Sequence, residues 1–210
     1  MYRSLRLTEL FCGAPLRNKE RIISADRLGT LELYSPSAPF FVFLEDDFMK
    51  KVGIIMGSDS DLPIIKKTTD VLKTLEIPFE VHIYSAHRTP VEARDFALSA
   101  RDNGFGVLIA AAGMAAHLAG AIAANTTLPV IGIPCKSVNL DGMDALLSTV
   151  QMPTGIPVAT VAINGGANAA LLAAQIIAVE DKDLASKLDT KRASDAAAVL
   201  EKDSTVMEKL

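Results

Sequence analysis

The stretch KVGIIMGSDSDLPIIKKTTDVLKTL, residues 51–75, contains the pattern that decides the fold. Val52–Met56 is a short apolar run, which predicts a buried strand. A polar turn follows, and then apolar side chains recur at helical spacing with lysines on the other side, which predicts an amphipathic helix. The residues that recur on this side of the helix are Leu62, Ile65, Thr69, Leu72 and Leu75. A strand, a loop and a helix in this order begin a parallel sheet with crossover helices.

The same alternation continues along the chain. We expect helices over Pro90 to about Asn103, Ala116–Asn125 and Asp181–Glu201, the last one amphipathic. The stretch Gly166–Val179 is apolar nearly all round, so we predict a helix buried on several sides, in part against another subunit. Further strands are predicted at Phe79–Tyr84, Val107–Ala112, Val130–Ile133 and Val158–Ile163. The fold class is therefore α/β, a three-layer sandwich with a parallel sheet between helices.

Composition excludes several classes of function. The 210 residues are 50% hydrophobic and carry a net charge of −4, which argues against binding to a nucleic-acid backbone. Val107–Ala116 and Ala169–Val179 are the longest apolar stretches, and both are shorter than the roughly 20 residues of a membrane span. The two cysteines, Cys12 and Cys135, form no disulfide framework or metal-ligand motif, which indicates a reducing compartment, the cytoplasm.

Residues 1–48 differ from the rest of the chain. They hold seven of the eleven aromatic residues and five of the nine arginines, whereas residues 49–210 are rich in alanine. We interpret residues 1–48 as an extension outside the functional domain, with Met49 as a candidate start of the protein proper. The alternative is a targeting peptide, but the seven acidic residues of this segment do not fit that class.

Three loops with chemically useful side chains follow the first three predicted strands. They are Gly57–Asp61, Ser85–Pro90 and Ala112–His117. Ligands of open parallel sheets bind at the carboxyl ends of the strands, where such loops gather. These loops are therefore the candidate binding site.

The first loop suits a sugar phosphate. Gly57 allows a tight turn, and Ser58 or Ser60 can cap the next helix, whose free amides favour an anion. Asp61 beside a bound phosphate would instead accept hydrogen bonds from ribose hydroxyls. The alternative for these residues is ordinary helix capping.

The second loop pairs His87 with Arg88. Histidine is suited to proton transfer near neutral pH, and the guanidinium fork binds phosphate bidentately. A functional pair is favoured by its place after a strand, although a solvated surface pair is the alternative. His82 shares a strand face with Glu80 and Tyr84, so we expect it to have a structural or surface role.

In the third loop, Gly113 precedes His117, which either orients a ligand carboxylate or supports another loop. A zinc site of His87, His117 and Cys135 can be drawn, but no ligand spacing supports it. Gly104-Phe105-Gly106 precedes a strand and lacks a third glycine, so it is no dinucleotide motif, and there is no Walker-type phosphate loop.

Four segments together resemble the signature segments of the N5-carboxyaminoimidazole ribonucleotide mutase family of de novo purine biosynthesis. They are Gly57–Asp61, Ser85–Pro90, Ala112–Leu118 and Gln151–Val158. The resemblance spans about Lys51 to Val179 and does not cover residues 1–48. It implies a flavodoxin-like α/β fold, a homo-octamer, a ribonucleotide substrate, and no metal or organic cofactor.

The resemblance also implies roles for individual residues. His87 would be the general acid and base, and the ribonucleotide would contact Ser58, Asp61, Arg88, Ser85, Gly113 and His117. Met114 and Ala119 depart from the family pattern, which commonly has glycine and proline there. Two alternatives to the mutase are direct carboxylation of aminoimidazole ribonucleotide by CO2, and a non-catalytic module that binds a mononucleotide.

Overall fold

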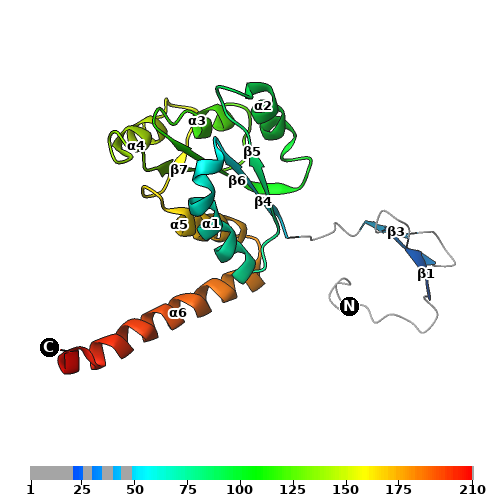
Figure 1. Ribbon diagram of the computed structural model, residues 1–210. Helices are drawn as coiled ribbons and strands as arrows, with labels where there is room; N and C mark the ends of the chain where they lie inside the picture. The colour runs from blue at the N-terminus through cyan, green and yellow to red at the C-terminus, as the bar shows by residue number, and fades with distance from the viewer. Residues whose placement is uncertain (1–20, 26–29, 35–39, 44–48, 210) are drawn as a thin grey trace. The chain divides into compact units, whose positions relative to one another are not determined.

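The computed structural model describes residues 21–25, 30–34, 40–43 and 49–209 (Figure 1). The chain divides into two compact units, Met1–Phe48 and Met49–Leu210. The side chains of residues 1–48, those of Cys12 and of the aromatic and arginine residues included, lie outside the described part. The described strands of the first unit form an antiparallel sheet of β1 (Arg21–Ala25), β2 (Thr30–Tyr34) and β3 (Phe40–Phe43).

The second unit is built on a five-stranded parallel sheet with the order β5-β4-β6-β7-β8 (Figure 1). Each strand lies close to its predicted position, although β8 is only two residues long. The strands are β4 (Lys51–Met56), β5 (Phe79–Ile83), β6 (Phe105–Gly113), β7 (Val130–Cys135) and β8 (Ala159–Thr160). The three-layer α/β prediction is therefore confirmed.

Helices cover both faces of this sheet. Clusters of buried side chains place α1, α5 and the start of α6 on one face, and α2 and α3 on the other. The helices are α1 (Leu62–Thr74), α2 (Pro90–Ser99), α3 (Leu118–Ala123), α4 (Met143–Val150), α5 (Gly166–Ile177) and α6 (Lys182–Ser204). No helix was predicted where α4 lies. Among the described residues, no helix is long and apolar enough to cross a membrane.

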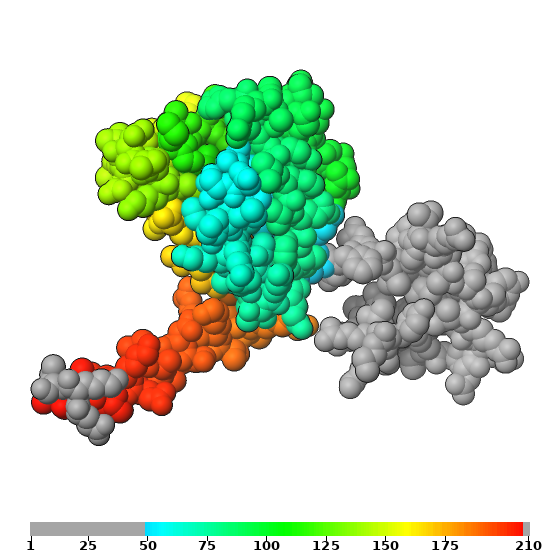
Figure 2. Space-filling model, in the orientation of Figure 1, coloured from blue at the N-terminus to red at the C-terminus, as the bar shows by residue number. Residues whose placement is uncertain are grey.

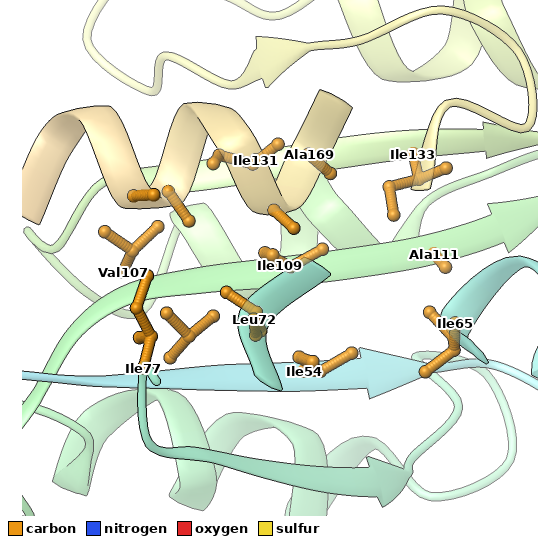
Figure 3. Packing of buried hydrophobic residues seen from close by; sticks show 14 of the residues in the cluster. Ile54, Ile65, Leu72, Ile77, Val107, Ile109, Ala111, Ile131, Ile133 and Ala169 are labelled. Atoms are coloured by element: carbon orange, nitrogen blue, oxygen red, sulfur yellow. The ribbon is translucent and has the colours of Figure 1, made fainter. Parts of the chain in front are cut away.

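The central strands are buried on both sides, as expected for a parallel sheet between helices. Successive side chains alternate between the two clusters, so Ile54 faces α1 and α5 while Ile55 faces α2 and α3. Figure 3 shows the first cluster, where Leu72 of α1 packs near Ile54 and Ile109 of the sheet. This rigid double layer holds the loops at the ends of the strands.

One face of helix α5 is buried within its own chain, whereas Leu171, Leu172 and Ile176 are only partly buried, so the contact of this helix with another subunit stays a prediction. Its alanine face is fully buried in the first cluster. Gly166 begins the helix, and a Cβ there would lie 2.4 Å from the carbonyl oxygen of Ile64 in α1. Thr68 of α1 donates a hydrogen bond to the Gly166 carbonyl at 3.0 Å. The small residues therefore let two helices pack closely.

Helix α6 begins against the domain and continues away from it (Figure 2). Asp181 caps its first turn by accepting a hydrogen bond from the Leu184 amide at 2.8 Å, and Leu184 is buried. Lys187 pairs with Glu76 at the end of α1. Residues 192–200 are all exposed, Val199 and Leu200 among them.

Candidate active site

The three candidate loops lie side by side because their strands are neighbours in the sheet. β4 lies between β5 and β6, and all three strands point the same way. Their carboxyl ends are Met56, Ile83 and Gly113. The predicted gathering of the loops at this edge is therefore present in the structure.

The first loop forms a short 3₁₀ turn, η2 (Asp59–Asp61), before α1. Ser58 caps this turn by accepting a hydrogen bond from the Ser60 amide at 3.3 Å, and its hydroxyl lies 3.1 Å from an Asp59 carboxylate oxygen. Ser60 was the other candidate cap, but it does not fill that role. The loop thus takes its shape from Ser58.

Asp61 stands at the N-cap position of α1 but makes no capping hydrogen bond with its side chain. It is one of the few buried polar residues of the described part, with 9% of its surface exposed. Burial raises the pKa of Asp61, an effect that hydrogen bonds from Cys135, the Ser58 backbone and Ser60 oppose. Capping therefore does not explain why this carboxylate is buried.

The second loop is organised by Ser85 and Thr89. The Ser85 hydroxyl accepts hydrogen bonds from the backbone amides of His87 and Arg88 at 3.3 and 3.2 Å. Thr89 accepts a hydrogen bond from the Ser85 amide at 2.8 Å. Ser85 thus shapes the backbone that presents the two candidate side chains.

His87 and Arg88 are both exposed at this edge. Arg88 donates a hydrogen bond from Nη2 to the carbonyl oxygen of Gly57 at 2.7 Å. This bond joins the second loop to the first and leaves other guanidinium donors for a ligand. His82, as predicted, is separate: it stacks on Tyr84 with ring centroids 5.0 Å apart and contacts Phe96 of α2.

The third loop brings His117 to His87. His117 is exposed at the N-cap position of α3, and its ring centroid lies 5.6 Å from that of His87, with an interplanar angle of 64°. Between Gly113 and His117, Met114 has a left-handed backbone with φ 56°. Two imidazoles, a guanidinium and a buried carboxylate thus belong to three adjacent loops, a set of groups suited to proton transfer on an anionic ligand.

The family model described as AIR carboxylase matches residues 51–198. The chain belongs to the AIR carboxylase family. This agrees with the family resemblance that the signature segments carry. The match covers the five-stranded sheet, all three loops and most of α6.

Two of the similar proteins are named N5-carboxyaminoimidazole ribonucleotide mutase. That of Bacillus subtilis is 55% identical over 152 residues, which cover 71% of this chain and 94% of the relative. That of Pyrococcus abyssi is 54% identical over 144 residues, 69% of this chain and 83% of the relative. Phosphoribosylaminoimidazole carboxylase of Saccharomyces cerevisiae is 55% identical over 138 residues, but these cover 24% of that longer protein.

The fold of this AIR carboxylase family member is also found in a solved structure. The crystal structure of Treponema denticola PurE superposes with a TM-score of 0.67 and 31% sequence identity, and the alignment covers 74% of this chain and 97% of that one. The flavodoxin-like arrangement is therefore shown by structural comparison as well as by strand order.

Sequence reasoning missed a fourth loop at the same edge of the sheet. It follows β7, the neighbour of β6, and begins with Lys136 and Ser137. The Asn164 side chain accepts a hydrogen bond from the Lys136 amide at 2.8 Å, and the Ser137 hydroxyl lies 3.2 Å from an Asp144 oxygen. The polar residues Lys136 and Ser137, directly after a predicted strand, were the sequence signal that could have indicated this loop.

The fourth signature segment of this family member, Gln151–Val158, is not grouped with the three loops. It runs from the end of α4 to the start of β8, and β8 is the last strand of the sheet, on the opposite side from β5. There a hollow of about 720 Å³ opens between the segment and the ends of α2 and α3, with Leu98, Arg101 and Ile156 in its lining. This hollow contains none of the candidate site residues.

The zinc site that could be drawn from His87, His117 and Cys135 is not assembled. In the part of the chain that the structure describes, no group of three or more His, Cys, Asp or Glu side chains is arranged to hold a metal ion. Cys135 is a free, buried thiol at the end of β7, beneath the loops.

Proposed function

We propose that this protein is an isomerase of de novo purine biosynthesis that converts N5-carboxyaminoimidazole ribonucleotide into 4-carboxy-5-aminoimidazole ribonucleotide. The observation that carries the proposal is the meeting of His87, Arg88 and His117 beside the loop of Ser58 and Asp61. Mutase relatives from Bacillus subtilis and Pyrococcus abyssi support the same reaction. In this proposal the reaction uses no ATP, metal or organic cofactor.

Binding of the ribonucleotide is assigned to the first two loops. Arg88 offers a fork of donors to the phosphate, whereas at the start of α1 the Leu62 amide is already bonded to the Asp59 carbonyl and Pro63 carries no N–H. Asp61 accepts hydrogen bonds from the ribose hydroxyls. Ser58 and Ser85 hold these loops in shape and contact the nucleotide, and Gly113 lets the third loop approach it closely.

The chemical step is assigned to His87. As imidazolium it gives a proton to the carbamate nitrogen, so that the N–C bond breaks and CO2 leaves. Ring carbon C4 then attacks CO2 and forms the new C–C bond, and neutral His87 removes the C4 proton and regains its charge. One imidazole serves both steps because a histidine side chain can both give and take a proton near neutral pH. His117 lies where it can orient the migrating carboxylate.

Completion of the site by further copies of the chain is part of the proposal. His87, Arg88 and His117 are exposed in the single chain, whereas retention of CO2 needs a site that excludes water. Exposed apolar side chains are available for subunit contacts on and before α4: Val138, Leu140, Met143, Leu147 and Val150. We propose the homo-octamer that the family resemblance implies. Sedimentation equilibrium of the purified protein measures the mass directly, and a monomer would contradict it.

The remaining partner and location assignments follow from composition and chemistry. We propose a small-molecule substrate and no nucleic-acid or membrane partner, because the net charge is −4 and the site offers one local anion-binding group. The free thiol of Cys135 is compatible with the cytoplasm.

Residues 1–48 are proposed to lie outside the functional domain. The family match begins at residue 51, and the compact second unit begins at Met49. A truncated protein that begins at Met49 should retain the kcat and KM of the full chain. A large loss of activity in soluble, folded truncated protein would contradict the proposal.

One assay separates the candidate reactions. Purified protein receives the N-carboxylated nucleotide without ATP, in buffer with 13C-bicarbonate, and in a second reaction the decarboxylated nucleotide with the same bicarbonate. A mutase converts the first substrate efficiently and keeps its unlabelled carboxyl group. Efficient conversion of the second substrate, with label in the product, would favour the carboxylase, the activity in the name of the Saccharomyces cerevisiae relative. Conversion of neither would favour a nucleotide-binding module.

A further inference from the structure

The fourth loop at this edge, residues 136–142, begins beside the third. β6 and β7 are neighbouring parallel strands (Figure 1), and their last paired residues are Gly113 and Cys135. A Cβ at Gly113 would lie 3.4 Å from the carbonyl oxygen of Cys135, which belongs to the peptide bond that leads into Lys136. Lys136 therefore starts the fourth loop next to the point where the third loop leaves the sheet.

Strand alternation places Lys136 on the side of the sheet where His117 lies. Successive residues of a strand face opposite sides, so Gly132, Pro134 and the next such position, Lys136, share one side. A Cβ at Gly132 would lie 3.3 Å from the Cβ of Ala119 in α3, so α3 covers this side. His117 is the N-cap residue of the same helix. Lys136 and His117 thus stand on one side of the sheet, at its carboxyl edge.

The backbone of Lys136 is held in place from two directions. The Asn164 side chain, after β8, accepts a hydrogen bond from the Lys136 amide at 2.8 Å, and the Asn164 amide donates one to the Pro134 carbonyl at 2.8 Å. Gly142 packs so closely that a Cβ there would lie 3.1 Å from the Cα of Lys136. This fixed backbone limits the region that the long side chain can reach.

The ammonium group of Lys136 is paired at the surface. Its Nζ lies 3.1 Å from a carboxylate oxygen of Asp141, and the two side chains are 58% and 81% exposed. Exposed ion pairs contribute little to stability, because water and salt screen them. The pair with Asp141 therefore keeps the ammonium at the edge of the sheet and yields it readily to an anion of a ligand.

Arg88 and Lys136 are the two permanent cations of the loops at this edge. The five described loops that follow β4, β5, β6, β7 and β8 contain no other lysine or arginine. The proposed substrate carries two anionic groups, a phosphate and a carboxylate. Arg88 is bonded to the first loop and is assigned to the phosphate. Lys136 lies on the side of His117, which is assigned to the carboxylate, so each anion has its own cation.

We propose that Lys136 is a substrate-binding residue whose ammonium group leaves Asp141 and pairs with the carboxylate of the carboxylated nucleotide. This inference rests on the proposed function, in which His117 orients that carboxylate. It makes Lys136 a specificity residue, because the decarboxylated nucleotide carries the phosphate alone. Lys136 lies outside the three predicted loops and all four signature segments.

The test measures two dissociation constants by calorimetry on the full chain, those of 4-carboxy-5-aminoimidazole ribonucleotide and of aminoimidazole ribonucleotide. Lys136→Met removes the charge and keeps a long side chain. Loss of one charge-assisted contact predicts that the Kd of the carboxylated nucleotide rises about tenfold, while that of the decarboxylated nucleotide stays within about twofold. Lys136→Arg keeps a cation, and both Kd values should stay within about threefold of those of the unmodified protein.

Two further variants separate this effect from a general one. Arg88→Lys should weaken the binding of both nucleotides, because both carry the phosphate. Lys73→Met removes an equal charge from an exposed position in the last turn of α1, outside the loops, and should change neither Kd. Selective loss of the carboxylated nucleotide is thus expected in Lys136→Met alone.

The outcomes that overturn the inference are distinct. Kd values for Lys136→Met that match the unmodified protein would overturn it. So would an equal loss for both nucleotides, or a loss accompanied by a smaller mass in sedimentation equilibrium, since these results indicate a role in folding or assembly. Failure of the proposed function would appear instead as an unmodified protein that does not interconvert the two carboxylated nucleotides.

Discussion

His87 and His117 come from different loops, and their imidazole rings meet edge to face with centroids 5.6 Å apart. β5 ends just before the loop of His87 and β6 just before that of His117, and β4 lies between these two strands. The two histidines therefore meet because of the order of the strands in the sheet. It gives His87, the proposed acid and base, a neighbour that can restrict its orientation.

Replacement of His87 tests this pair. His87→Asn should retain nucleotide binding and lose turnover by about 10²–10⁴-fold, the usual contribution of a positioned acid or base. His117→Asn should lower turnover by at most about 10²-fold, the effect of a small misplacement. Single-turnover rates and calorimetric binding measure both. If His117 acts through His87, the double variant is no slower than His87→Asn alone, and near-normal turnover in His87→Asn would refute the assigned role.

Arg88→Lys tests the guanidinium that joins the first two loops. Lysine keeps the charge but loses the fork that can reach both Gly57 and a phosphate. We expect KM to rise by about tenfold, and inhibition by inorganic phosphate to weaken. Arg94→Lys, at an exposed position of α2, is the matched control and should leave both constants unchanged. Equal constants for the two variants would contradict a role for Arg88 in binding.

Asp61→Asn should stabilise the fold while it impairs activity. Burial raises the pKa of Asp61 in the folded state. The protonated Asp61 carboxyl therefore stabilises the fold at low pH. This contribution is lost as pH rises through the pKa that Asp61 has in the folded state. Near neutral pH, removal of the buried charge should add about 1 kcal/mol to the free energy of unfolding, or about 2–4 °C in melting temperature.

Calorimetric scans at acid and neutral pH measure this effect, and the advantage of Asp61→Asn should shrink in acid. Asp59→Asn is the control in the same turn, because Asp59 is exposed and its stability effect should stay within about 0.5 kcal/mol. Destabilisation by Asp61→Asn at neutral pH would show that the carboxylate is a structural group.

Met114→Gly should relieve backbone strain in the third loop. Met114 has φ 56°, in the left-handed region that costs a residue with a side chain about 1–2 kcal/mol. Part of the gain is offset by the greater freedom of glycine in the unfolded chain, so we expect about 0.5–1 kcal/mol of stabilisation. Urea unfolding measures it. Ala115→Gly is the control beside it and should destabilise, so stabilisation by both would refute this explanation.

Local patterns predicted most of the fold. Apolar runs and helical spacing gave β4, α1, β5 and α2 close to their observed bounds, because β4 is an apolar run buried on both faces and each of the two helices has one buried face. Helix α4 was missed, since its apolar side chains Met143, Leu147 and Val150 are exposed and its start at Gly142 has a left-handed backbone. The predicted contact of α5 with another subunit stays a prediction, because an apolar circumference does not say which chain covers each side of the helix.

The candidate site was only partly predictable for a related reason. A loop's place after a strand can be read from sequence, and this located Ser58, His87 and His117. Contacts between loops depend on strand order, which no local pattern contains. The bond from Arg88 to Gly57 and the ring contact of His87 with His117 are both of this kind.

Because β5 is an edge strand, we expect the protein to lose activity on heating before its domain unfolds. β5 pairs with β4 on one side and, among the described residues, with no strand on the other. Its aromatic contacts, His82 and Tyr84 against Phe96, hold it to α2. Edge elements open locally before a domain unfolds globally. On warming, the loop of His87 should therefore fray first, with faster amide exchange in β5 than in β6, so that heat inactivation begins in a protein that is still folded.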